Sequence, residues 1–76
     1  MTSAEQPQGQ YHFVLTVQKP LPSGGYTVSD WSGYMTPEPG WTRDDAYLAI
    51  RAEHAKRRPD LANACVLFFS LEPNQL

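Results

Sequence analysis

The sequence predicts a small α+β domain in which one helix packs on one face of a three-stranded, mainly antiparallel sheet. Three observations predict it. Apolar residues recur with period two over 11–18, and over 26–36 with one change of phase, as they do in half-buried strands. A helix N-terminus with capping residues begins at 41–46, and an apolar run of strand length occupies 64–71. The element order is therefore strand, strand, helix, strand (ββαβ).

The first strand is expected over 11–18, where side chains alternate between an apolar face and a more polar one. The apolar face holds alternate aromatic and aliphatic residues: Tyr11, Phe13, Leu15 and Val17. The other face holds His12, Val14, Thr16 and Gln18. Prolines and glycines within 19–25 then predict a loop longer than a two-residue hairpin turn.

The second strand, over 26–36, changes phase along its length. Tyr26 and Val28 share one face, whereas Trp31 and Met35 lie on the other. One extra residue near 29–30 would bring all four to a single apolar face, and a β-bulge inserts one such residue. Gly33 is a second candidate for the irregularity. We therefore expect a bulged strand.

The helix has the clearest local signal in the chain. Thr42 is a favourable N-cap, and Asp45 three residues later resembles the second member of a capping box. Basic residues at 56–58 suit the negative end of a helix dipole. The helix is expected to end at residue 57 or 58, because Pro59 follows.

One side of this helix is expected to face the sheet. Its apolar arc, read at 3.6 residues per turn, comprises Ala46, Tyr47, Ile50 and His54. A weaker arc on nearly the opposite side comprises Leu48, Ala52 and Ala55. Because the second arc is mostly alanine, helix propensity explains it without a buried neighbour.

The last strand, over 64–71, is apolar on both faces, which is typical of a strand with cover on both sides. One set of alternate residues is predicted to enter the core with the helix and the first strand: Cys65, Leu67, Phe69 and Leu71. Val66 and Phe68 then point to the other face. A single helix covers only one face, so these two residues are predicted to be left uncovered.

The sheet order is predicted to be 2-1-3. If the first two strands form an antiparallel pair, a right-handed crossover through the helix places the third strand beside the first. The alternative order inserts the last strand between the other two. Consecutive strands usually neighbour each other, which favours 2-1-3.

A chain of 76 residues forms one domain, and a domain of this size is marginally stable without further support. Residues 1–9 are polar and predict a disordered N-terminal tail, which leaves residues 10–76 as the domain. The single cysteine excludes an internal disulfide, and the two histidines lie far apart in the sequence. Self-association is therefore the expected source of additional stability.

Charge and hydropathy limit the classes of partner that the protein is expected to bind. The net charge is −2, so no overall field attracts nucleic acid or an anionic membrane. No window approaches the roughly 18 apolar residues that a membrane helix needs, and the N-terminus lacks the pattern of a secretory signal. We expect a cytoplasmic protein with a reduced thiol, whose partner is a second copy or another protein.

No catalytic, metal or cofactor site is predicted. Cys65 lies in an apolar strand, where a buried and unreactive thiol is expected rather than a nucleophile paired with His54 or His12. Asp44 and Asp45 are explained by their position in the first turn of the helix. The sequence offers no recognisable combination of a nucleophile, a base and oxyanion donors, so we predict that the protein is not an enzyme.

Two runs carry a resemblance to short actinobacterial (high-GC) proteins of no assigned function: Thr42-Arg43-Asp44-Asp45 at the helix start and Phe68-Phe69-Ser70-Leu71-Glu72-Pro73-Asn74 near the end. The resemblance covers residues 11–74. It implies a bacterial cytoplasmic origin, and it implies no activity, ligand or catalytic residue.

Two functions follow as hypotheses. The first is a non-enzymatic protein-interaction module of the adaptor or regulatory type, which forms a homodimer through the sheet face or edge that the helix leaves uncovered. Its predicted interface residues are Val66, Phe68, Val14, Trp31 and Tyr34. The alternative is binding of RNA or single-stranded nucleic acid by the same face and the basic helix C-terminus. The residues of that alternative are Arg51, Lys56, Arg57 and Arg58.

Overall fold

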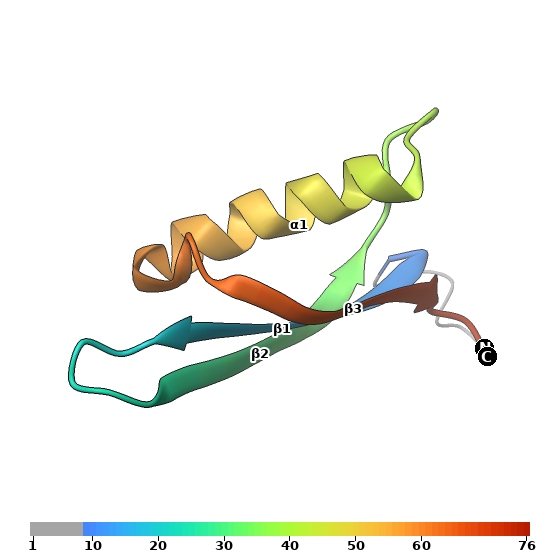
Figure 1. Cartoon of the computed structure of the whole chain (residues 1–76). Helices are drawn as coiled ribbons and strands as arrows, with labels where there is room; N and C mark the ends of the chain where they lie inside the picture. Colours follow the sequence, from blue (N-terminus) through green and yellow to red (C-terminus); the bar gives the residue numbers. More distant parts are fainter. Residues whose placement is uncertain (1–8) are drawn as a thin grey trace.

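The computed structural model describes residues 9–76; residues 1–8, which make up most of the predicted tail, lie outside the described residues. The elements in chain order are β1 (Tyr11–Pro20), β2 (Tyr26–Met35), α1 (Arg43–Arg57), the short 3-10 helix η2 (Pro59–Leu61) and β3 (Cys65–Pro73). The strands form one sheet in the order β2-β1-β3, with β1 antiparallel to both neighbours. Figure 1 shows α1 lying along one face of this sheet. The predicted ββαβ fold and the order 2-1-3 are confirmed.

The hairpin of β1 and β2 is regular over its whole length. The strands pair without a shift from Tyr11 opposite Met35 to Pro20 opposite Tyr26. The connecting loop contains Gly24 and Gly25, whose φ angles of 102° and 77° lie in the region that favours glycine. The bulge predicted in the second strand is therefore wrong: β2 keeps apolar side chains on both of its faces.

The irregularity lies in β3 instead. Phe69 is opposite Leu15 and Phe68 is opposite Thr16, but Val66 is opposite Val17, so Leu67 is the extra residue of a bulge. One extra residue reverses the faces of the residues before it.

This bulge corrects the predicted core face of β3. Val66, Phe69 and Leu71 pack against the core beneath α1. Cys65 and Leu67, which were predicted to be buried, are exposed. The prediction was wrong for these residues because it assumed an unbroken alternation through 64–71.

The start of α1 has the predicted capping box. The Asp45 backbone N–H donates to Oγ1 of Thr42 at 3.2 Å, and the Thr42 N–H donates to Oδ2 of Asp45 at 2.9 Å. These two bonds satisfy backbone donors that the first turn leaves without helical partners.

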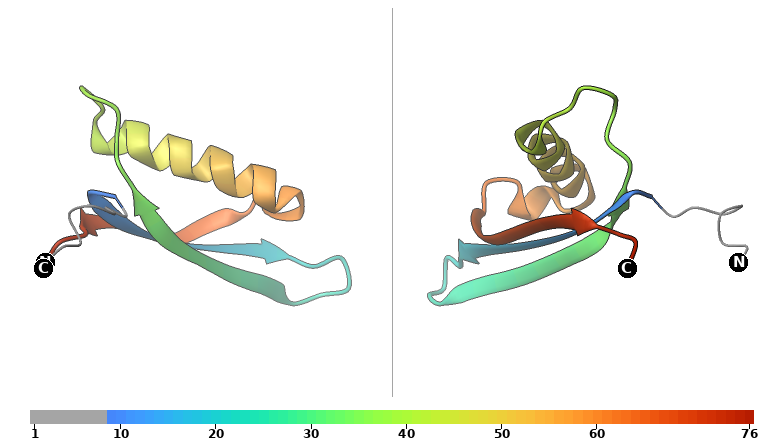
Figure 2. Two further views of the ribbon diagram at one scale, coloured as in Figure 1. Left: turned by 180° about the vertical axis from the view of Figure 1, so that it is seen from behind. Right: turned by 90° about the vertical axis from the view of Figure 1, so that its right-hand side faces the viewer.

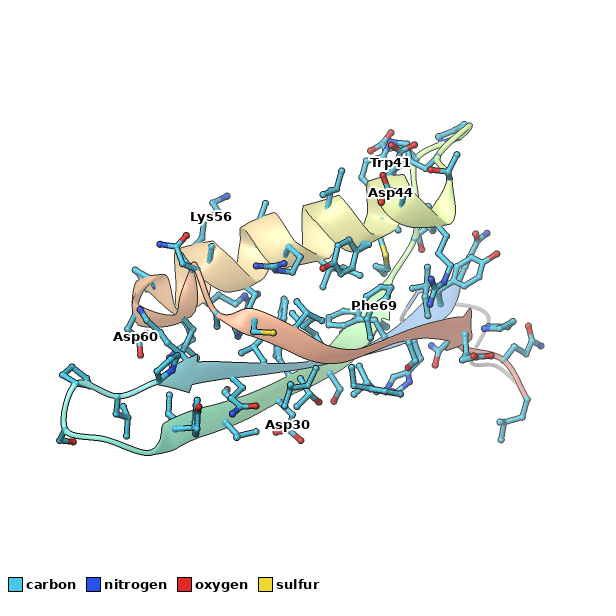
Figure 3. The ribbon with its side chains drawn as sticks, viewed as in Figure 1. Asp30, Trp41, Asp44, Lys56, Asp60 and Phe69 are labelled. Carbon is cyan, nitrogen blue, oxygen red and sulfur yellow. The ribbon has the colours of Figure 1, made fainter. Side chains whose placement is uncertain are left out.

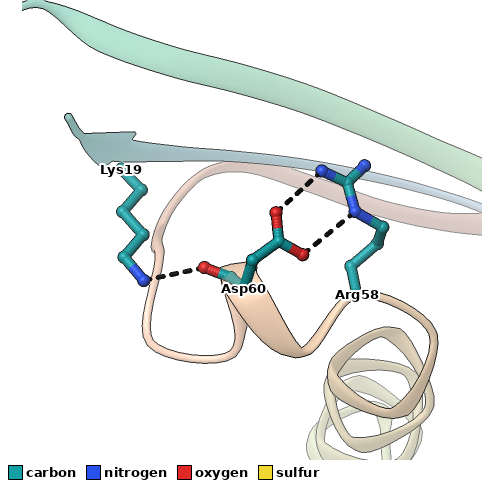
Figure 4. A network of polar contacts seen from close by, with 3 residues as sticks. All are labelled: Lys19, Arg58 and Asp60. Carbon is teal, nitrogen blue, oxygen red and sulfur yellow. Dashed lines mark hydrogen bonds and ion pairs between the residues drawn. The ribbon is translucent and has the colours of Figure 1, made fainter.

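The far end of α1 is joined to the hairpin through η2 (Figure 4). Arg58 donates two hydrogen bonds to the Asp60 carboxylate, at 3.2 and 3.0 Å. Lys19, near the end of β1, donates from Nζ to the Asp60 carbonyl oxygen at 2.7 Å. The contact between β1 and η2 therefore closes this end of the domain.

The core is a single layer between α1 and the sheet. Its buried apolar residues are Phe13, Leu15, Val17, Ala46, Ile50, Leu61 and Ala64. On the β3 side Tyr47 packs edge-on against Phe69, with 4.9 Å between ring centroids. On the β2 side Trp31 stacks on the buried His54 ring at 5.5 Å. The helix arc that was predicted to face the sheet does so.

Candidate interaction surface

The face of the sheet that points away from α1 is covered by no other element of residues 9–76 (Figure 2). We call it the open face. Residues opposite each other on neighbouring strands share a face, so the strand pairing gives its composition in rows across β2, β1 and β3. The rows are Tyr34–His12–Glu72, Ser32–Val14–Ser70, Asp30–Thr16–Phe68 and Val28–Gln18–Cys65.

Large apolar side chains are exposed on the open face. On β2 the exposed fractions are 64% for Tyr26, 60% for Val28 and 55% for Tyr34. On β3 Phe68 is 54% exposed. Leu67 is also exposed, but as the extra residue of the bulge it belongs to none of these rows. Isolated exposed apolar residues are common, but several on one side of so small a sheet form a surface of the kind that marks an interaction site.

The charges of the open face lie toward its margins. Its two carboxylates are Asp30 on β2 and Glu72 on β3, and these are the two outer strands of the sheet. Figure 3 shows Asp30 pointing away from α1, whereas Phe69 lies between α1 and β3. Among the residues of its four rows there is no lysine or arginine. An uncharged centre with a polar margin is the usual arrangement of a protein–protein interface.

Three of the five predicted interface residues lie on the open face. Phe68 and Tyr34 are exposed there, and Val14 is half-buried at its centre. The other two are corrected. Val66 is turned to the core by the bulge, and Trp31 makes a T-shaped contact with Phe13, with ring centroids 4.9 Å apart.

Two exposed residues of β2 were missed as candidates, Tyr26 and Val28. The predicted bulge placed them on one face with Trp31 and Met35, so they were not recognised as a separate exposed pair. Strict alternation of side chains along β2, without a bulge, would have placed both residues on the face opposite Trp31.

A groove runs between β2 and α1 on the covered side of the sheet. It encloses about 450 Å³ and exposes the edge of the core. Apolar side chains line most of it, including Phe13, Trp31, Met35 and Ile50, with Glu53 and Arg57 at its margin. Its position shows that α1 leaves part of the β2 side uncovered.

The basic residues of the nucleic-acid alternative have local partners. Lys56 and Arg57 form ion pairs with Glu53 at 3.7 and 3.4 Å, and Arg57 also lies over the Trp31 ring at 5.2 Å. Arg58 pairs with Asp60 at 3.0 Å. Arg51 donates to the Tyr47 hydroxyl at 3.1 Å and to the Ala64 carbonyl oxygen at 3.5 Å. These four residues belong to α1 and its C-cap, on the opposite side of the sheet from the open face.

The cysteine and the histidines do not come together. Cys65 is exposed opposite Gln18, whereas His54 is buried beneath α1 on the other side of the sheet. His12 shares the open face with Cys65, but its row lies six positions along β1 from the row of Gln18, which is about 20 Å along a strand. Within residues 9–76 no three His, Cys, Asp or Glu side chains form a group that could hold a metal ion.

Burial lowers the pKa of His54 below its ordinary value, and the nearby positive charges of Arg58 and Arg51 act in the same direction. Asp60 opposes them weakly, because its negative charge favours the protonated ring. The neutral ring is therefore the form that suits its stacked position on Trp31.

In the part of the chain that the structure describes, no helix has the length and apolar character needed to cross a bilayer. Comparison of the chain with protein-family models, with curated proteins and with solved structures finds no match.

Proposed function

We propose that this protein is a small non-enzymatic interaction module that forms a homodimer through the sheet surface that α1 leaves uncovered, either the open face or the β2 edge. One observation carries the proposal: one side of the sheet is packed beneath α1, while the other exposes apolar side chains on both outer strands. A monomer of this size has little core to offset such exposure.

A second copy is a suitable partner because it brings the same uncharged centre and the same polar margin. In a two-fold interface each copy presents one patch to the identical patch of the other. Val14 and Thr16 of the central strand carry no charge, and the carboxylates of Asp30 and Glu72 remain near solvent. In the route through the open faces, burial of the exposed aromatic and aliphatic groups supplies the favourable free energy.

Nucleic acid is less well supported as the ligand. Binding to phosphates requires lysine or arginine along the path of the backbone. The rows of the open face carry none, and Arg57 and Arg58 are already paired with acidic neighbours. The charge pattern therefore favours a protein partner.

We place this module in the cytoplasm as part of the same proposal. The supporting observation is Cys65, an exposed cysteine without a disulfide partner in the chain. Free thiols of this kind persist in a reducing compartment.

Sedimentation velocity over a range of micromolar concentrations tests the proposal. We expect the weight-average mass to move from that of one chain toward that of two as the concentration rises. A mass that stays at one chain throughout would contradict self-association by any surface.

Phe68→Glu separates the two routes to a dimer. Packing of two open faces would bury Phe68, so a carboxylate there would dissociate the dimer. Pairing through the β2 edge leaves Phe68 exposed, because it lies on β3, two strands away. Leu48→Glu is the matched control, since Leu48 is comparably exposed but lies on α1.

A further inference from the structure

We infer that the dimer forms by antiparallel pairing of the β2 edges of two copies, which joins the two sheets into one continuous sheet. This inference depends on the proposed self-association and specifies its surface and register. It selects one of the two routes above and predicts that Phe68→Glu leaves the dimer intact.

The two outer strands differ in how they are protected against pairing. Native edge strands usually carry a bulge, a proline or a lysine that prevents another strand from adding to them. β3 has a bulge at Leu67 and ends at Pro73. β2 has neither a bulge nor a proline, lysine or arginine over its ten residues, and Asp30 is its only charged residue. β2 is thus a long, regular and unprotected edge, the kind that pairs with another strand.

The groove beside β2 gives this edge an apolar contact in addition to backbone hydrogen bonds. The first turns of α1 lean toward β3, where Arg43 lies over the Phe69 ring at 5.1 Å and Tyr47 packs against the same ring. The opposite side, along β2, is where Trp31 and Met35 line the open groove. A strand added at β2 would bring its own side chains against this exposed part of the core.

The sequence of β2 allows a specific pairing with itself. A two-fold axis that makes two strands antiparallel within one sheet runs perpendicular to that sheet, so both helices lie on the same side. Residues that face each other must then have the same parity, because side chains alternate with period two. Only registers centred on a residue meet this condition.

The register centred on Trp31 fits best. It aligns residues 27–35 of one copy with residues 35–27 of the other, which is nearly the whole strand. Asp30 then lies opposite the partner's Ser32, and Val28 opposite the partner's Tyr34. Centring on Asp30 instead would place two carboxylates opposite each other, which destabilises a sheet. The two Trp31 side chains meet on the groove side, where both grooves open.

Cysteine cross-linking in the full chain tests this register. In a Cys65→Ser background, Asp30→Cys in one copy is mixed with Ser32→Cys in a second copy that carries an affinity tag, and the mixture is oxidised gently. Directly opposed residues lie about 4.5–5.5 Å apart between Cα atoms, within reach of a disulfide. We expect the mixed disulfide in several-fold excess over either homodisulfide.

Ser70→Cys in place of Ser32→Cys is the matched control. Ser70 and Ser32 both lie opposite Val14 on the open face, one on each outer strand. In the proposed dimer Ser70 is three strand spacings, about 14 Å, from the partner's β2. We expect no disulfide between Ser70→Cys and Asp30→Cys.

The outcomes distinguish this inference from the proposed function. A dimer in sedimentation that cross-links through Ser70→Cys, or that forms no Asp30–Ser32 mixed disulfide, overturns the β2 edge and leaves self-association standing. A parent protein that remains monomeric overturns both.

Discussion

At the scale of single residues, His54 is the polar side chain that is buried among residues 9–76. Its ring lies on the side of α1 that faces the sheet, is almost fully buried and stacks on Trp31. Burial is the main reason that its pKa is lowered, followed by the positive charges of Arg58 and Arg51. The folded protein therefore favours the neutral ring more strongly than the unfolded chain does.

Because the pKa of His54 differs between the folded and unfolded states, the stability of the protein depends on pH. In the unfolded chain the ring takes up a proton near pH 6.5, its unperturbed value, but the folded state binds that proton only at lower pH. The contribution of the neutral ring to stability is complete above this unfolded value and is lost as the pH falls through and below it. Urea unfolding at fixed protein concentration between about pH 8 and pH 5 should show a decreasing midpoint.

His54→Leu should remove part of this decrease, because leucine occupies a similar apolar site without titrating. The comparison that matters is the slope of the midpoint against pH, since the variant also changes packing on Trp31. Equal slopes for the parent and the variant would show that His54 is not the group responsible.

Individual residues also show which parts of the core and of the interface could be predicted from the sequence. Phe13 and Leu15 were predicted to lie in the core and are buried, as is Val17 on the same face, because β1 alternates cleanly between apolar and more polar residues. The interface residues were predicted less well. Val66 and Trp31 were assigned to the uncovered side, although both pack against the core. In each case the strand is apolar on both faces, so hydrophobicity did not indicate which side was buried.

At the scale of elements, local chemistry predicted α1 and could not predict the bulge in β3. The capping residues of α1 act within one turn, so their spacing in the sequence is sufficient. The bulge at Leu67 depends on how β3 registers with β1, and no glycine or other distinctive residue within β3 marks it. A run with apolar residues of both parities fits either phase, and only packing against β1 and α1 selects one.

Thr42→Ala tests the contribution of the capping box. The change removes Oγ1, which accepts from the Asp45 N–H, and should lower the free energy of unfolding by about 0.5–2 kcal/mol. Chemical denaturation at fixed protein concentration measures it. Thr42→Ser keeps the acceptor and should recover most of the loss. If the serine and alanine variants were equally unstable, the cap would not be the cause.

At the scale of the whole molecule, the one-layer core and the unprotected β2 edge both favour association with a second copy. α1 and three strands bury a core of modest size, and the groove beside β2 leaves part of it open. A domain of this kind is expected to gain stability from association, as small domains without disulfides or metals usually do. Folding and dimerisation are then linked by mass action, so the thermal midpoint should rise with protein concentration.

Ser32→Asp tests the proposed dimer with a single substitution. In the register centred on Trp31, each new carboxylate lies opposite the partner's Asp30, so the dimer contains two repulsive pairs. Like charges directly opposite each other cost a few tenths to about 1 kcal/mol each, which corresponds to a dissociation constant raised about two- to thirty-fold. Ser70→Asp, on β3 at the same distance from Val14, should leave the dissociation constant unchanged. An equal effect of the two substitutions in analytical ultracentrifugation would argue for contact between the open faces instead, because that packing brings both serines to the interface.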